Sequence, residues 1–324
     1  MAEAGYARLM RVLGYSETVA ALDFPPLVEA LRQAFRKGGI ETPPADVYTI
    51  PVPQSQDGSL IVLPAWQPGK HFGVKLITIF PGKADPHRPA RMGSYLLCDG
   101  KSGELLALFD GPALTARRTA AASALAASYL ARPDSERLLM IGTGSLAAHL
   151  VEAHASVRPI HNVLVWGRDR DKAIRLARRL DRRQMKVAPA ADLERAVRGA
   201  HVICCATSAH EPILKGAWLP EGVHIDLVGG RAPHMREADD ETMSRARIFV
   251  DTREAAETQA GDIVGPLAAG VITSFDIAGD LFELTRGHRA GRRYNNQITL
   301  FKSVGHSLED LAGAQVALDN ARAG

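Results

Sequence analysis

The sequence has few cysteines and no long apolar segment. Its three cysteines, Cys98, Cys204 and Cys205, are too few among 324 residues for the disulfide framework of a small secreted domain, so we expect a reducing, cytoplasmic setting. No apolar run approaches the roughly 18 residues of a membrane-spanning helix. Residues 1–5 also begin no apolar signal segment. The sequence therefore predicts no membrane partner.

An excess of charge of one sign is lacking as well. The chain carries 39 lysines and arginines against 36 aspartates and glutamates, a balance that does not indicate a nucleic-acid-binding protein. The basic run of residues 168–183 has no interleaved aromatic residues on which bases could stack, so we interpret it as a solvated helix face. No metal site is predicted, because His201, His210 and His224 lack the clustering of metal ligands.

The pattern of hydrophobicity changes near residue 130. Before it, short β-rich runs within residues 47–109 follow one another without helices, which indicates an antiparallel or mixed sheet, and residues 115–130 resemble one long helix. After it, apolar strands alternate with helices, as in a doubly wound parallel sheet. The predicted fold class is α/β, with a Rossmann-type parallel sheet beside an α+β domain.

A glycine-rich turn directly follows the apolar strand predicted at residues 138–141. Residues 142–147 read Gly-Thr-Gly-Ser-Leu-Ala, the G-x-G-x-x-A pattern of dinucleotide-binding turns. The first glycine permits the tight turn, the second lets a pyrophosphate approach the backbone, and the helix start offers amides to the phosphates. A plain strand-to-helix turn is the alternative interpretation.

The end of the next strand, residues 163–166, bears on the type of cofactor. An NAD site usually has an acid there, which binds the ribose hydroxyls. This sequence has Arg168 instead, whose guanidinium could bind a 2′-phosphate. NADP is therefore favoured. NAD is the alternative, with Asp169 binding the ribose and Arg168 a solvated surface residue.

Several segments, in chain order, resemble the ornithine cyclodeaminase and mu-crystallin family. They are residues 63–65, 74–82, 114–123, 142–147, 228–230 and 301–305. The resemblance implies an NAD(P)-dependent homodimer that acts on a small imino or amino acid. It also implies that residues 1–130, joined by residues 300–324, form a substrate and dimerisation domain beside a dinucleotide-binding domain over residues 131–299.

The resemblance further implies roles for individual residues. Lys75 and Arg118 match the ligands of the substrate carboxylate, which agrees with the bidentate fork of arginine and with the cost of burying a strand lysine without an anion. A strand lysine that reaches solvent is the alternative for Lys75. The positions that match cofactor-binding residues are Thr115, Thr119, Gly142, Gly144, Ser145, Leu146, Arg168, Thr207, Val228 and Val304. Helix caps, a turn hydroxyl and a core valine are the alternatives for the threonines and Val304.

One position matches a substrate-pocket residue, and three depart from the family. Glu254 matches a pocket glutamate of some relatives, with a surface helix acid as the alternative. Ala45 replaces a carboxylate-binding arginine, and Lys83 replaces an asparagine. Arg231 stands where cyclodeaminases have the aspartate that handles the substrate amine, and a cation there would repel the side-chain ammonium of ornithine.

These residues lead to one predicted function and two alternatives. We expect an oxidoreductase that reduces a small cyclic ketimine acid, such as pyrroline- or piperidine-2-carboxylate. The first alternative is an ornithine cyclodeaminase, which forms proline and ammonia. The second is a non-catalytic ligand-binding protein of the mu-crystallin kind, which the presence of Lys75 and Arg118 disfavours.

Overall fold

The computed structural model describes residues 10–82 and 89–323. Contacts divide the chain into two compact units, unit 1 with residues 1–118 and 307–324, and unit 2 with residues 119–306. Lys83 lies outside the described residues. None of the helices within the described ranges combines the length and apolar character that a membrane span needs.

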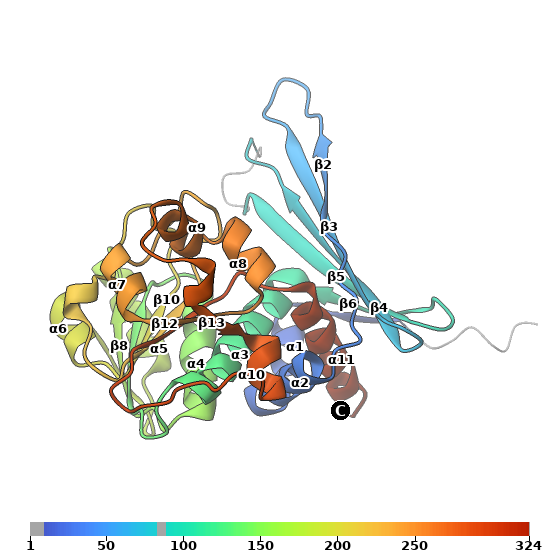
Figure 1. The fold of residues 1–324 in the computed structure, drawn as a ribbon. Helices are drawn as coiled ribbons and strands as arrows, with labels where there is room; N and C mark the ends of the chain where they lie inside the picture. Colours follow the sequence, from blue (N-terminus) through green and yellow to red (C-terminus); the bar gives the residue numbers. More distant parts are fainter. Residues whose placement is uncertain (1–9, 83–88, 324) are drawn as a thin grey trace, which may run out of the picture. The chain divides into compact units, whose positions relative to one another are not determined.

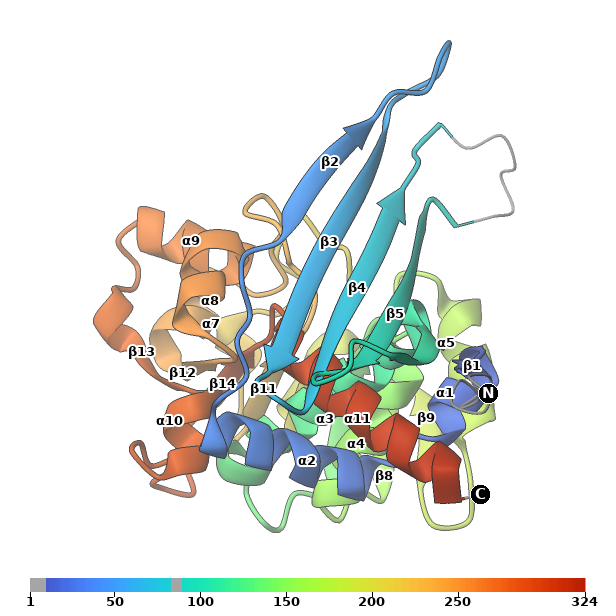
Figure 2. The same ribbon diagram turned by 90° about the vertical axis from the view of Figure 1, so that its right-hand side faces the viewer.

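Unit 1 is built on a six-stranded mixed sheet (Figure 2). Burial alternates along its central strand β4, where Gly73, Lys75 and Ile77 are buried and their neighbours are only partly buried, as the two-residue period of a strand requires. Helix α11 packs against α2 and against β3, β4 and β5. The sheet order is β1 (Arg11–Leu13), β6 (Leu105–Asp110), β5 (Arg91–Asp99), β4 (His71–Ile79), β3 (Gly58–Gln67) and β2 (Asp46–Ile50), and the helices are α1 (Tyr15–Ala20), α2 (Phe24–Lys37) and α11 (Ser307–Ala323).

Unit 2 is built on an eight-stranded sheet in which every pair of neighbouring strands is parallel (Figure 1). Strands β10 and β11 are buried along their whole length, as expected for inner strands of a sheet covered on both faces. The predicted doubly wound α/β fold is thereby confirmed. The order is β13 (Ile277–Asp280), β12 (Arg247–Val250), β14 (Thr299–Lys302), β11 (His224–Leu227), β10 (Val202–Cys205), β7 (Arg137–Ile141), β8 (Asn162–Trp166) and β9 (Lys186–Pro189).

Helices follow most strands of unit 2, and short 3₁₀ turns complete the connections. They are α4 (Ala147–Val157), α5 (Arg170–Leu180), α6 (Leu193–Arg198), α7 (Asp240–Arg245), α8 (Arg253–Gln259), α9 (Gly261–Ala268), α10 (Leu281–Arg286), η1 (Gly216–Trp218) and η2 (Ser274–Asp276). Sheet order reverses between β7 and β10, because β8 and β9 lie on one side of β7 and the later strands lie on the other.

Helix α3 (Gly111–Leu130) belongs to both units, since Arg118 is the last residue of unit 1 and Thr119 the first of unit 2. The helix begins four residues before Thr115, the predicted start, because the Asp110 carboxylate accepts the amide hydrogen of Ala113 at 2.8 Å and caps it. Thr115 therefore lies within the helix and is not its cap.

The chain leaves unit 2 later than the sequence indicates. Strand β14 pairs with both β11 and β12 and is thus an inner strand of the parallel sheet. Unit 1 consequently resumes at Ser307 and not at residue 300. The roles assigned to the two predicted domains stay predictions.

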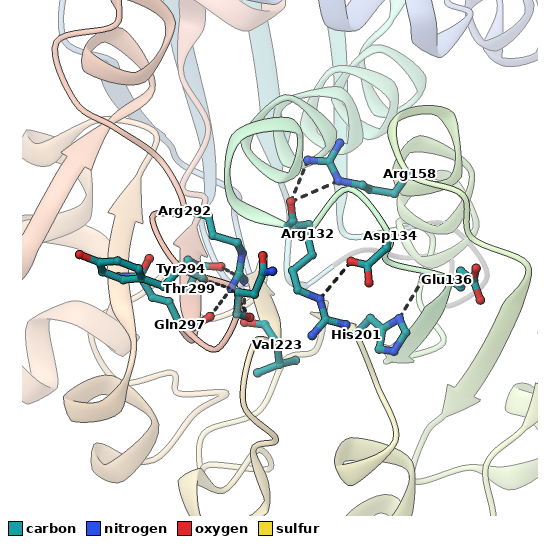
Figure 3. A network of polar contacts seen from close by, with 12 residues as sticks. Arg132, Asp134, Glu136, Arg158, His201, Val223, Arg292, Tyr294, Gln297 and Thr299 are labelled. Carbon is teal, nitrogen blue, oxygen red and sulfur yellow. Dashed lines mark hydrogen bonds and ion pairs between the residues drawn. The ribbon is translucent and has the colours of Figure 1, made fainter.

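Arginines close the carboxyl end of α3 (Figure 3). The last four carbonyl groups of a helix have no partner within the helix. Arg158 donates a hydrogen bond to the carbonyl oxygen of Ala131 at 2.8 Å, and Arg292 donates to that of Leu130 at 2.7 Å and to the Thr299 hydroxyl oxygen at 2.9 Å. Positive charge is also favourable at this end of the helix dipole.

Replacing Arg292 by alanine should destabilise the protein by about 2–3 kcal/mol, because several buried carbonyl groups lose a charged donor. The free energy of unfolding in urea measures this loss. Arg293→Ala is the matched control, since Arg293 is exposed and its loss should change stability by no more than about 0.5 kcal/mol. Equal stability of both variants would contradict the capping role of Arg292.

Candidate functional site

A cavity of about 610 Å³ lies at the carboxyl ends of β7, β8 and β10. Doubly wound sheets bind ligands at this place, where the strand order reverses. Its volume is typical of small-molecule pockets. The described residues that line it are 142–144, 166–169, 172 and 206–213.

The two glycines of the turn differ in what they require. Gly142 has a φ of +119°, and a Cβ there would lie 2.4 Å from the carbonyl oxygen of Ala206, so only glycine fits. At Gly144, no atom of the described residues lies within 4 Å of such a Cβ. Gly144 is exposed just before α4, and the open space above it suits the pyrophosphate of a dinucleotide.

Charges at the end of β8 favour an anionic ligand. Asp169 accepts the amide hydrogen of Lys172 at 3.1 Å and caps α5, and this hydrogen bond lowers the pKa of Asp169. The same carboxylate lies 3.6 Å from the Lys172 ammonium. Arg168 and Lys172 both line the cavity, so two cations and one carboxylate face it. The Asp169 carboxylate thus caps α5. The two cations outnumber it, so the net charge at this end of the cavity is positive and favours a phosphate group on the ribose.

The structure brings only some of the predicted cofactor residues into this cavity. Gly142, Gly144, Arg168 and Thr207 line it. The others lie elsewhere in the chain: Ser145 and Leu146 follow the turn, Val228 follows β11, Val304 follows β14, Thr119 opens unit 2 and Thr115 lies in unit 1. Val304 donates its amide hydrogen to the Asp251 carboxylate at 2.6 Å.

In unit 1, Lys75 and Arg118 meet at one carboxylate. The Lys75 ammonium lies 3.1 Å from Asp310 Oδ1, and Arg118 Nε donates to the same oxygen at 2.9 Å. Arg118 also pairs with Glu309, and all four side chains are buried. The lysine thus has the anionic partner that burial requires.

Burial and neighbouring charges set the protonation of this cluster. Burial lowers the pKa of Lys75 to about 8, although Asp310 opposes the shift. Burial by itself disfavours the ionised forms of Arg118 and Asp310, but their mutual attraction outweighs it, so the pKa of Arg118 is raised and that of Asp310 is lowered. The cluster therefore holds a permanent cation beside one that exchanges its proton near neutral pH.

Sequence reasoning missed Glu309 and Asp310. Asp310 is 235 residues from Lys75 and 192 from Arg118, and no local pattern joins them. The available signal was two adjacent acids inside an apolar stretch, since Leu308 and Leu311 flank them and charged residues are rarely buried without a partner.

A second polar group lies in the core of unit 2. Asp226 accepts hydrogen bonds from Ser123 Oγ at 3.0 Å and from Cys204 Sγ at 3.1 Å, and it lies 3.0 Å from His154 Nε2. Potential ligand atoms of His154, Cys204 and Asp226 lie within 4.8 Å of one another. These separations are those of hydrogen bonds, so hydrogen bonds to Asp226 explain the arrangement of the three side chains. Burial raises the pKa of Cys204 and Cys205 well above the usual range.

Comparisons with known proteins agree with this architecture. A sequence profile of the ornithine cyclodeaminase/mu-crystallin family matches residues 11–324. The chain belongs to this family. The predicted family is therefore confirmed.

Curated relatives match over nearly the whole chain. The chain is 38% identical to a Δ1-pyrroline-2-carboxylate reductase of Paracoccus denitrificans, over 92% of this chain and 93% of the relative. It is 36% identical to the ketimine reductase mu-crystallin of Rattus norvegicus, over 93% and 92%. A solved structure of Thermococcus litoralis Δ1-pyrroline-2-carboxylate reductase in complex with NADH and L-proline matches with a TM-score of 0.88 and 32% identity, over 97% of this chain and 98% of that one.

The remaining predicted positions lie on the surface. Arg231 is exposed in the turn after Gly230, Glu254 is exposed in the first turn of α8, and Ala45 is exposed just before β2. Arg231 and Glu254 are not among the lining residues of the cavity. Their roles in substrate binding, like those of Lys75 and Arg118, stay predictions.

Alanine substitutions at the two glycines should differ in their effect on stability, because only Gly142 lacks the space for a side chain. Gly142→Ala should lower the thermal unfolding midpoint by several degrees, because its Cβ would clash with the Ala206 carbonyl in a backbone conformation that favours glycine. Gly144→Ala should leave the midpoint unchanged, since space surrounds the added methyl group. A loss of stability in Gly144→Ala equal to that in Gly142→Ala would refute this distinction.

Proposed function

We propose that the protein reduces a small cyclic ketimine acid, such as pyrroline- or piperidine-2-carboxylate, to the corresponding cyclic amino acid with a reduced nicotinamide dinucleotide. The observation that carries this proposal is the buried pair of Lys75 and Arg118, with Lys75 able to exchange its proton near neutral pH. The activities named for the relatives from Paracoccus denitrificans and Rattus norvegicus support the same reaction class.

Residues of unit 2 would hold the cofactor, which supplies a hydride when bound. The open space above Gly144 and the start of α4 accept the pyrophosphate. Arg168 and Lys172 bind the 2′-phosphate, so we propose NADPH, with NADH as the alternative. Thr207 contributes a hydroxyl to the same cavity. The Thermococcus litoralis relative was solved with NADH, so this choice calls for a direct test.

Residues of unit 1 would hold the substrate. Arg118 binds the carboxylate, because a permanently charged guanidinium can present paired N–H donors to it. Lys75 donates the proton that the imine nitrogen gains as its carbon gains the hydride, and the products are a secondary amine and the neutral lysine. An approaching carboxylate favours the protonated form of Lys75, so the donor is charged when the substrate binds. Lys75 is then reprotonated from solvent for the next turnover.

Arg231 makes ornithine a poor substrate, because the Arg231 guanidinium and the side-chain ammonium of ornithine would repel each other.

We also propose a homodimer in a reducing, cytoplasmic setting. The dimer is supported by exposed apolar side chains on one face of the sheet, where Tyr48 on β2 and Met92 on β5 lie in register through Leu60 and Thr78 and are 51% and 50% exposed. The setting is supported by the three cysteines, all of which are free thiols.

The test of this function is oxidation of NADPH and of NADH, followed by the absorbance of the reduced nicotinamide, with cyclic imines as substrates. Open-chain keto acids plus ammonia and ornithine with NAD⁺ are the comparison substrates. We expect turnover of the cyclic imines to be fastest. If no imine is turned over, the proposal is wrong, and release of ammonia from ornithine would establish the cyclodeaminase instead.

The same assay across pH tests Lys75. In the wild type kcat/KM should fall above about pH 8, because Lys75 loses its proton there. Lys75→Arg keeps the charge but not the exchangeable proton, so kcat should fall by about 10²–10⁴-fold with a smaller change in KM. Lys70→Arg, an exposed lysine, is the control. An unchanged kcat in Lys75→Arg would exclude Lys75 as the proton donor.

Cofactor choice is tested with Arg168→Ala. The variant should bind NADPH about tenfold to a hundredfold more weakly, since charge-assisted hydrogen bonds are lost, while its affinity for NADH barely changes. Trp166 lines the cavity, so quenching of tryptophan fluorescence can follow both titrations. Arg170→Ala, whose side chain is exposed outside the lining, is the control. Equal weakening of both dinucleotides would mean that Arg168 does not bind the 2′-phosphate.

A further inference from the structure

One wall of the cavity has no regular secondary structure. Residues 206–213 line it between β10 and the single bridge at Leu214. Such a loop keeps one shape only if other segments satisfy its backbone hydrogen-bonding groups. The wall therefore depends on whatever holds it from behind.

A short segment around Glu237 holds this wall at both ends. The Glu237 carboxylate accepts hydrogen bonds from the Thr207 amide at 2.7 Å and from the Thr207 hydroxyl at 2.8 Å. The Glu237 carbonyl oxygen accepts the amide hydrogens of Ile213 and Leu214, each at 2.9 Å. Between these ends, the Arg236 amide donates to the carbonyl oxygen of Ala209 at 3.0 Å.

The same carboxylate also holds the turn after β11. Its second oxygen accepts the amide hydrogen of Gly229 at 2.8 Å. A Cβ at Gly229 would lie 2.2 Å from the Thr207 carbonyl oxygen and 2.5 Å from the Glu237 carboxylate. Glycine is thus required here, because the wall and the carboxylate pack directly against the backbone.

Two further buried charges fix Glu237 itself. One oxygen of Asp262 accepts the amide hydrogens of Glu237 at 2.7 Å and of Ala238 at 3.0 Å. The other lies 3.1 Å from the Lys302 ammonium, and both side chains are fully buried. Lys302 also donates to the carbonyl oxygen of Gly229. Lys302, Asp262 and Glu237 therefore form one connected group behind the wall.

We propose that Glu237 is a positioning residue whose ionised carboxylate holds Thr207 and the wall 206–213 in the conformation that binds the dinucleotide. This inference rests on the proposed function, since it concerns the same cavity. The ionised carboxylate accepts these three hydrogen bonds as charge-assisted bonds, which are about twice as strong as bonds between neutral groups. Protonation removes the charge and weakens both oxygens as acceptors, so the wall is held less firmly.

Protonation of Glu237 occurs in an accessible pH range. Burial raises its pKa to about 7; Lys302 on β14 lowers the pKa, and Asp262 on α9 raises it further. On β10 the thiols of Cys204 and Cys205 stay protonated, because burial raises their pKa well above the usual range. Dinucleotide affinity should therefore decrease as the pH falls below about 7.

Stability should change in the opposite direction. The pKa of Glu237 is higher in the folded than in the unfolded chain, so the folded state binds more protons between about pH 4.5 and 7. The contribution of this group to stability is present at low pH and is lost as the pH rises through this range. If the role of Glu237 were purely structural, dinucleotide affinity and stability would change in the same direction with pH. For a positioning role, we expect affinity to decrease and the stability contribution of Glu237 to increase as the pH falls.

The experiment titrates NADPH and NADH into the full-length wild type and into Glu237→Gln, from about pH 5.5 to about pH 8.5, with tryptophan fluorescence as the readout. Wild-type affinity should fall by up to about tenfold per pH unit below pH 7. Glu237→Gln should bind about tenfold or more weakly at pH 8, without this pH dependence. The ratio of the two proteins at each pH cancels every pH effect that both share, the titration of the 2′-phosphate included.

Glu221→Gln, an exposed acid of unit 2, is the matched control, and thermal unfolding of each protein reports stability. A wild type that binds neither dinucleotide would overturn the proposed function and this inference with it. A wild type that binds with the same affinity at every pH, or a Glu237→Gln variant that binds as the wild type does, would overturn this inference alone. A wild-type affinity that does not change with pH overturns the inference even if the variant does not fold.

Discussion

The ion pairs of the Asp310 carboxylate are the interactions on which the buried charges of unit 1 depend. It holds Lys75 on β4 and Arg118 on α3, both buried. Removing an ion from water costs several kcal/mol unless a partner of opposite charge compensates it. Neither cation could remain buried and charged without the acids of α11, so a helix near the end of the chain is required to stabilise a charged lysine on a strand near its beginning.

The same constraint, that a buried charge needs a partner, shapes the cavity of unit 2. Lys302, Asp262 and Glu237 are buried behind its irregular wall, and each is held by another charge or by backbone amides. An irregular loop has no ladder of hydrogen bonds to neighbouring strands. A buried charged group therefore provides the hydrogen-bond partners that a neighbouring strand would otherwise provide. In both units a connected set of buried charges holds groups that stand beside the proposed ligands. Such sets are costly when incomplete, which makes the wall sensitive to a single proton.

Burial brings the pKa values of Lys75 and Glu237 close to neutral pH. Burial lowers the pKa of the lysine to about 8 and raises that of the glutamate to about 7. In each case the charged form is disfavoured, and a neighbour of opposite charge prevents a larger shift. The proposed roles differ, because an anionic substrate keeps Lys75 protonated while the amides of the wall require an ionised Glu237.

The sequence by itself determined the features that depend on neighbouring residues. The β-rich runs within residues 47–109, the strand at residues 138–141 and the glycine turn at 142–147 follow from sterics and solvation over a few residues, and they led to the fold class. Short segments in chain order led to the family. Only the tertiary structure placed β14 inside the parallel sheet and brought Asp310 to Lys75 and Arg118. It alone put Glu237 behind Thr207. Strand order and charge pairing join residues far apart in the chain, and their energies depend on burial, which no local pattern encodes.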